Sequence, residues 1–303
     1  MDFRTHLPVM GTPMPDTIQS RPSDPARDFC QWPYDPPLQP APGALRQSAI
    51  LFHALTLMPN GSALLAVVLR IRAFWGRFNT VWGLKSADGR LGLELYFYDY
   101  DRAERRTKIS AFLNAFPDLF APSFTIDDDI PFFMCSIEFN AEDSRLLEAR
   151  THMTTIDLYT DGFGGTTSAG LCHAWDGVSL TLKNIYRFYE SHPDRAEITS
   201  AMAASARTSQ IKKLPPELCA GAWQEEIFVF AQKRTSDCVY FSRIKIQAVR
   251  DLCAKFAFPP EIIGFLADQD ANLAHHLFDV GIDYTVSSGG DALPAKAGLY
   301  GLL

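Results

Sequence analysis

The chain has 303 residues, enough for one large domain or two of ordinary size. Hydrophobic residues make up 47% and charged residues 21%, which excludes a wholly disordered chain. The net charge of −7 argues against general nucleic-acid binding, which requires a surplus of lysine and arginine. No stretch approaches 18 uninterrupted apolar residues, so we expect no membrane span.

We expect a cytoplasmic protein, because the N-terminus lacks the apolar core of a secretory signal. None of the six cysteines has C-x-x-C spacing, so neither a zinc knuckle nor a thioredoxin-type site is expected. We therefore expect reduced thiols, with Cys135, Cys172 and Cys238 as small core residues in apolar, strand-like runs.

Residues 1–43 form a separate compositional region that contains ten of the chain's 20 prolines. Proline removes an amide donor and fixes φ, so this region cannot form a long helix or a central strand. We predict an arm that is either disordered or an extended strap, and that is dispensable for folding unless Trp32 or Tyr34 anchors it. Residues 44–303 contain no linker and are predicted to form a single domain.

The spacing of apolar residues and the positions of glycine and proline predict the elements of this domain. In chain order they are a helix over 44–57, a stretch over 63–74 whose valines favour strand over helix, a hairpin over 77–85 and 90–100, a helix over 103–116, strands over 132–140, 155–161 and 168–176, a helix over 194–209, a hairpin over 226–234 and 238–242, helices over 245–256 and 260–267, and a hairpin over 279–286 and 296–302.

The order of these elements favours one fold class. Strands that arrive as antiparallel hairpins do not fit a doubly wound parallel sheet. Most strands have one apolar and one polar face, as in 93–98, where Glu94, Tyr96 and Tyr98 alternate with apolar residues. An open twisted sheet of this size tends to curl. We therefore predict an α+β fold in which about ten antiparallel strands close into a barrel, with helices outside and the polar face around a lumen.

This arrangement resembles the αββα barrel of the aromatic prenyltransferases. The likeness rests on the run Cys238–Ser242 (CVYFS) before a helix, on Leu93–Phe97 (LELYF) before the helix at 109–116, and on a last strand, Lys296–Tyr300 (KAGLY), with a lysine followed by a tyrosine. The resemblance implies a lumen that binds an isoprenyl diphosphate and a small aromatic acceptor.

The resemblance also implies roles for particular residues, because lysine, arginine and tyrosine would hold the diphosphate and aromatic faces would shield the allyl cation. The candidates for substrate binding are Arg70, Arg77, Lys85, Tyr96 and Lys296, the arginines only if their segments are strands. The candidates for catalysis are Glu94, Tyr98, Tyr159, Tyr240 and Tyr300. Glu138 and Asp157 are candidate ligands for Mg²⁺, although some members of the family work without a metal.

Four acidic residues expected on the inward faces depart from the family pattern: Glu94, Glu138, Asp157 and Asp283. Unpaired carboxylates repel a diphosphate unless magnesium or the cations offset them. Polar alternation is also found where a sheet face meets water, and tyrosine is common in strands. Two alternatives to prenyl transfer therefore stay open. One is a non-catalytic ligand-binding or scaffolding protein. The other is an enzyme whose acidic lumen binds a metal, with Glu94, Glu138 and Asp157 within coordination distance of one another.

Overall fold

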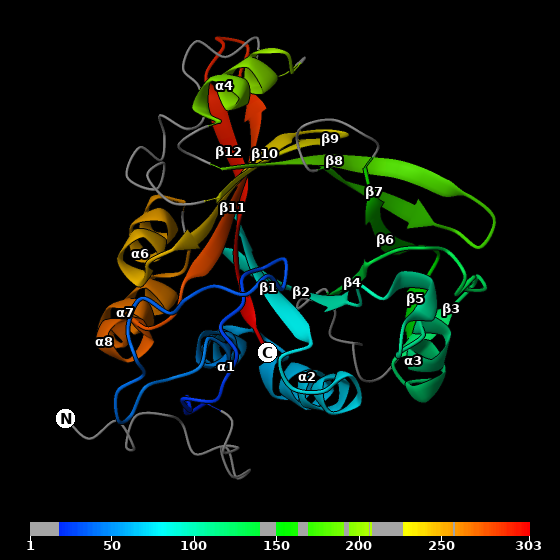
Figure 1. The fold of residues 1–303 in the computed structure, drawn as a ribbon, viewed down its shortest axis with the longest axis horizontal. Coiled ribbons are helices and arrows are strands. Elements are labelled where there is room, and N and C mark those ends of the chain that lie inside the picture. Colours follow the sequence, from blue (N-terminus) through cyan, green and yellow to red (C-terminus); the bar gives the residue numbers. More distant parts are fainter. Residues whose placement is uncertain are drawn as a thin grey trace.

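A computed structural model describes residues 18–139, 150–162, 169–190, 194–205, 207, 227–256 and 258–303. Within them, ten antiparallel strands close into a barrel, and helices pack on its outside (Figure 1). The predicted α+β barrel is therefore confirmed. Residues 1–17 of the arm, the last residues of the segments predicted over 132–140 and 194–209, and Cys219 lie outside the described residues.

Each barrel strand is antiparallel to both of its neighbours. The order around the barrel is β1 (Thr80–Ala87), β12 (Ala292–Leu302), β11 (Phe278–Val286), β10 (Asp237–Ile244), β9 (Ile227–Lys233), β8 (Leu180–Glu190), β7 (Ala169–Trp175), β6 (Ile156–Asp161), β4 (Met134–Phe139) and β2 (Arg90–Tyr98), which pairs again with β1. A separate pair of short parallel strands is formed by β3 (Phe120–Pro122) and β5 (Thr151–Met153).

The helices lie outside the barrel, where their apolar faces cover the strands (Figure 1). They are α1 (Ser48–Leu57), α2 (Gly61–Trp75), α3 (Ile109–Ala115), α4 (Arg195–Ala203), α6 (Ile246–Lys255), α7 (Pro260–Asp268) and α8 (Asp270–Leu273), with a 3₁₀ turn, η2 (Arg102–Glu104), before α3. In the described part of the chain, no helix is long and apolar enough to cross a membrane.

The two faces of each strand have the predicted directions. Leu95 and Phe97 on β2 are buried in the outer core, where the ring of Phe97 stacks on Trp75 of α2 at 4.9 Å. Tyr96, between them in sequence, belongs to the inner cluster of side chains around the lumen. The three cysteines predicted as core residues, Cys135, Cys172 and Cys238, are all buried and unpaired.

Two elements correct the sequence prediction. The stretch over 63–74 is not a strand but lies in the helix α2, because its buried apolar residues recur at helical spacing: Leu64, Val67, Val68, Ile71 and Trp75. The missing tenth strand is β8, which was not predicted. Its residues are mostly half-exposed, and Leu182, Lys183 and Asn184 interrupt the alternation of apolar and polar residues that identifies a strand.

The described part of the proline-rich arm, residues 18–43, is a strap held against the barrel. Tyr34 is buried, and its Oη both donates to the carbonyl of Leu277 (3.3 Å) and accepts from the amide of Leu277 (3.0 Å). The ring of Trp32 lies 5.6 Å from that of Phe188 on β8. Both anchor residues named from the sequence therefore make the contacts of a strap, and we expect the arm to contribute to stability.

Candidate functional site

The antiparallel order of the strands gives the barrel two different ends. The turns that join β1 to β2, β7 to β8, β9 to β10 and β11 to β12 all lie at one end, called the hairpin end here. The strap lies at the opposite end, where residues 27–34 contact β8, β10 and β11. The inward-facing side chains differ accordingly: charged residues gather toward the hairpin end and aromatic residues follow below them.

The first charged cluster lies on β1, β2 and β4. Lys85 pairs with Glu94, and its Nζ is also 3.2 Å from Oε1 of Glu138. Tyr96 donates a hydrogen bond from Oη to Oε2 of Glu94 at 2.6 Å. Lys85 and Glu94 are nearly buried, whereas 62% of the Glu138 side chain is exposed, so Glu138 is the partner that is free to move into solvent.

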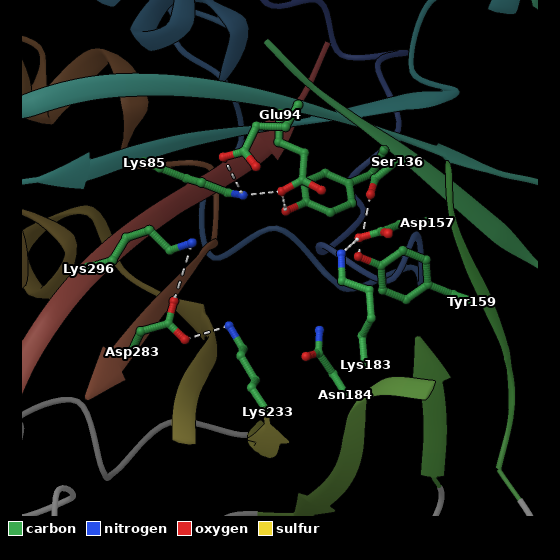
Figure 2. Close-up of polar contacts among 12 residues, drawn as sticks. Lys85, Glu94, Ser136, Asp157, Tyr159, Lys183, Asn184, Lys233, Asp283 and Lys296 are labelled. Atoms are coloured by element: carbon green, nitrogen blue, oxygen red, sulfur yellow. Dashed lines mark hydrogen bonds and ion pairs between the residues drawn. The ribbon is translucent and has the colours of Figure 1, made fainter. Parts of the chain in front are cut away.

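Three more lysines point into the lumen from other strands (Figure 2). Lys183 on β8 contacts Asp157 on β6, with 2.5 Å between Nζ and Oδ2. Asp283 on β11 lies between two lysines: its Oδ1 is 2.5 Å from Nζ of Lys233, and its Oδ2 is 3.7 Å from Nζ of Lys296. We call these four lysines and their partners Glu94, Glu138, Asp157 and Asp283 the charged mouth.

The ion pairs set the protonation states in the charged mouth. Burial alone would raise the pKa of Glu94, but Lys85 outweighs it and lowers the pKa to about 2. Burial would lower the pKa of Lys85, but Glu94 and Glu138 hold it above its ordinary value. Burial raises the pKa of Asp157, against the effect of Lys183. The four lysines and four carboxylates balance in number, so the unpaired carboxylates expected from the sequence are in fact paired.

Below the charged mouth, five tyrosines from different strands form a continuous belt. In order they are Tyr96, Tyr300, Tyr240, Tyr186 and Tyr159, with successive ring centroids 5.9, 6.0, 6.2 and 6.1 Å apart. Burial raises the pKa of every one of these hydroxyls, so the tyrosine belt is neutral. It offers aromatic faces and hydroxyl groups to whatever occupies the lumen.

Glycines on the neighbouring strands make room for the belt. A Cβ at Gly281 would lie 2.5 Å from Cε1 of Tyr240, and one at Gly83 would lie 2.9 Å from Cε1 of Tyr300. Real Cβ atoms do not approach other atoms so closely, so only glycine lets these rings lie flat against the barrel wall.

Most of the residues selected from the sequence face the lumen. Lys85, Glu94, Glu138, Asp157, Asp283 and Lys296 belong to the charged mouth, and Tyr96, Tyr159, Tyr240 and Tyr300 belong to the tyrosine belt. Closure of the barrel pairs β1 with β12 and so brings Lys85 opposite Gly298, two residues from Lys296. Tyr98 also faces inward, but it lies deeper, 6.2 Å from Phe29 of the strap.

Two predicted substrate-binding residues are not in the lumen. Arg70 lies on α2, outside the barrel, where it forms an exposed ion pair with Asp118 at 2.6 Å. Arg77 is exposed in the turn between α2 and β1. The prediction that both face the lumen required their segments to be strands. The segment 61–75 is a helix, so the prediction is wrong for Arg70.

The sequence prediction missed four lumen residues. Lys183, Asn184 and Tyr186 lie on β8, the strand that was not predicted. The register between β7 and β8 shifts by one residue at Lys183, which turns both Lys183 and Asn184 inward (Figure 2). Lys233 ends a strand that was predicted, and its alternation with Val229 and Ala231 would have identified it as an inward residue.

The carboxylates do not form a metal site. No group of three or more histidine, cysteine, aspartate and glutamate side chains in the described residues could hold a metal ion. Glu138 and Asp157, the candidate Mg²⁺ ligands, each contact a different lysine instead. A cation at either residue would have to displace that lysine, so the residues present do not fit a magnesium ion.

Neither the protein-family models nor the curated protein sequences compared with this chain match it.

Proposed function

We propose that the protein transfers an isoprenyl group from its diphosphate to a small aromatic acceptor inside the barrel. The observation that supports this most strongly is the arrangement of two layers. Lysines from four strands meet at the charged mouth, and the tyrosine belt lies directly below them. An allylic diphosphate has the matching polarity, with an anionic head and an apolar tail that becomes cationic when it ionises.

In the proposed reaction, the bond between the allylic carbon and the diphosphate oxygen breaks, and the electron pair leaves with the diphosphate. Lysines stabilise the added negative charge, and neutral tyrosine faces stabilise the allyl cation through their quadrupoles. A ring carbon of the acceptor then forms the new bond and loses its proton. Glu94, which its pairing with Lys85 keeps ionised, is the proposed proton acceptor; the cationic ring carbon is a strong acid, so a carboxylate of low pKa can still accept its proton.

The lysines must exchange partners for the diphosphate to bind. Two of their contacts are the easiest to break: Lys85 with Glu138, whose carboxylate is mostly exposed, and Lys296 with Asp283, which are 3.7 Å apart. Lys85 and Lys296 are therefore the proposed first contacts of the diphosphate, and both were named as candidates from the sequence. Lys183 and Lys233, whose contacts are shorter, would complete the binding site.

Lys296 offers the sharper test, because 37% of its side chain is exposed and its loss should affect folding little. We expect dimethylallyl and geranyl diphosphate to bind in a calorimetric titration, more weakly at high salt. Loss of one charge-assisted contact, about 1.5–3 kcal/mol, should weaken binding by roughly 10- to 100-fold in Lys296→Ala. Lys255→Ala, on the outer helix α6, is the matched control and should bind as the wild type does.

Product formation is measured in parallel, as the mass of one isoprenyl group added to phenols or indoles. No binding of either diphosphate at millimolar concentration, with or without magnesium, would refute the proposal.

A second function is favoured by the charge balance of the mouth. Because each lysine already has a carboxylate partner, the lumen also suits a neutral aromatic or apolar ligand that leaves these pairs intact. A ligand-binding protein of this kind would bind the acceptor or a prenyl alcohol, would not bind the diphosphate, and would form no product.

A further inference from the structure

One residue of the proline-rich strap reaches into the barrel. The ring of Phe29 contacts Tyr300 at 4.7 Å and Tyr96 at 5.1 Å, both edge-to-face, and stacks against Tyr240 at 6.3 Å. These are three of the five rings of the tyrosine belt. Phe29 therefore closes the belt from the end opposite the charged mouth.

The strap holds this ring in place through a hydrogen-bonded loop. The amide of Asp28 donates to the carbonyl of Trp32 (3.0 Å), and the amide of Trp32 donates back to Oδ1 of Asp28 (3.0 Å). The loop is tied to the barrel at three points. Arg243 of β10 contacts Oδ2 of Asp28 at 3.0 Å, the amide of Phe29 donates to Oδ2 of Asp279 at 2.9 Å, and Tyr100 donates to the carbonyl of Cys30 at 2.7 Å.

Behind Phe29 lies a small cavity of about 30 Å³. Its wall includes Phe29 and Trp32 from the strap and Tyr186, Phe188 and Val229 from the barrel. Asp28, Ser242 and Asp279 also line the cavity, but its accessible wall is mainly apolar. Tyr186 and Tyr240 belong both to this wall and to the tyrosine belt. Removing the Phe29 ring would join this cavity to the lumen.

The strand register gives the separation between Phe29 and Lys85 along the barrel. Tyr300 pairs with Gly83 and Tyr96 pairs with Val81, so Phe29 lies two to four residues below Lys85 along β1. At about 3.3 Å per residue, and with the usual strand tilt in a barrel, that distance is roughly 5–10 Å along the barrel axis. A tail that extends from the charged mouth to Phe29 would therefore have the length of a short isoprenyl chain and not of a long one.

We propose that Phe29 is the floor of the lumen and limits the length of the apolar tail that the barrel accepts. Within the proposed function, on which this inference rests, the donor is dimethylallyl or geranyl diphosphate and not farnesyl diphosphate. Phe29 is thus a specificity-determining residue that comes from outside the barrel strands. Phe29→Ala should admit the longer tail without changing the charged mouth.

The test compares Phe29→Ala, Phe29→Leu and the wild type by calorimetry with dimethylallyl, geranyl and farnesyl diphosphate. Newly buried methylenes contribute about 0.8 kcal/mol each, so a farnesyl tail that gains two or more should bind at least about tenfold more tightly to Phe29→Ala. Dimethylallyl diphosphate should bind almost unchanged, and Phe29→Leu should fall between. Tyr34→Phe, which loses a strap anchor away from the lumen, is the matched control and should keep the wild-type order.

A parallel series with dimethylallyl alcohol, geraniol and farnesol measures tail length without the diphosphate. If only the alcohols bind, and farnesol gains selectively in Phe29→Ala, the floor is supported while the proposed transfer fails. If the diphosphates bind but the variants keep the wild-type preference, the transfer proposal stands and the floor is refuted. A gain for farnesyl ligands in Tyr34→Phe equal to that in Phe29→Ala would also refute it, because strap loosening would then be the cause.

Discussion

The stability that is lost in Lys85→Met should depend on pH, because the substitution removes the buried cation that pairs with Glu94. In the wild type, Lys85 lowers the pKa of Glu94 from 4.5 to about 2. At 1.36 kcal/mol per pKa unit this difference corresponds to about 3 kcal/mol of stability. That stability is present above pH 4.5 and is lost as the pH falls through 4.5 toward 2. Lys85→Met leaves a buried carboxylate without its cation, which typically costs about 3–5 kcal/mol.

The cost of the substitution should itself change with pH. In Lys85→Met, burial raises the pKa of Glu94, so protonation of the carboxylate relieves the penalty as the pH falls. We expect urea unfolding to show a loss of roughly 3 kcal/mol at pH 7 and a clearly smaller loss at pH 4. The double variant Lys85→Met/Glu94→Gln should recover part of the stability at pH 7. An equal loss at both pH values would show that packing, and not the unpaired charge, causes the effect.

Three further predictions concern the core, the strap and the buried carboxylate that holds it. Leu95→Ala should lower the free energy of unfolding in urea by about 2–5 kcal/mol, because its side chain is fully buried under the helices. Tyr96→Phe should lower it by about 1–3 kcal/mol, because the hydrogen bond to Glu94 is lost. Equal losses near the upper limit would contradict the assignment of the two faces. Deleting residues 1–34 should lower the melting temperature by about 5 °C or more, because the contacts of Phe29 and Tyr34 are lost; an unchanged temperature in a thermal scan would show that the strap does not stabilise the barrel. Burial, with Asp28 nearby, raises the pKa of Asp279 to about 7, above its unfolded value of 3.8. This group should therefore reduce stability as the pH rises from 4 to 7, and Asp279→Asn should flatten that decline. A slope of stability against pH identical to that of the wild type would contradict the raised pKa.

Local patterns were sufficient for much of the barrel wall. The turn at Asp88 and Gly89 and the alternation through Leu93, Glu94, Leu95 and Tyr96 depend on neighbours in sequence, and both predicted β1 and β2 correctly. The same reasoning failed for 63–74 and for β8. The valines of α2 are compatible with either element, and the bulge at Lys183 breaks the period of two that identifies a strand.

The lumen shows a similar division. Alternation alone placed Lys85, Glu94 and Tyr300 on inward faces, because successive side chains of a strand must point to opposite sides of the sheet. Which charges would meet could not be read along the chain. Lys183 on β8 contacts Asp157 on β6 across the intervening strand β7, and Asp283 on β11 lies between lysines of β9 and β12. These ion pairs therefore exist only after the strands have found their register.

Phe29 is the clearest case of a role decided by tertiary structure. The sequence predicted a proline-rich arm that forms no long helix and no central strand, and this much follows from proline's fixed φ and missing amide donor. Nothing local distinguishes Phe29 from the other apolar residues of the arm. Its place among Tyr96, Tyr240 and Tyr300 depends on three strands that closure brings together and on the hydrogen bond that its backbone amide donates to Asp279, 250 residues away. Contacts over such separations form only when the whole barrel is assembled.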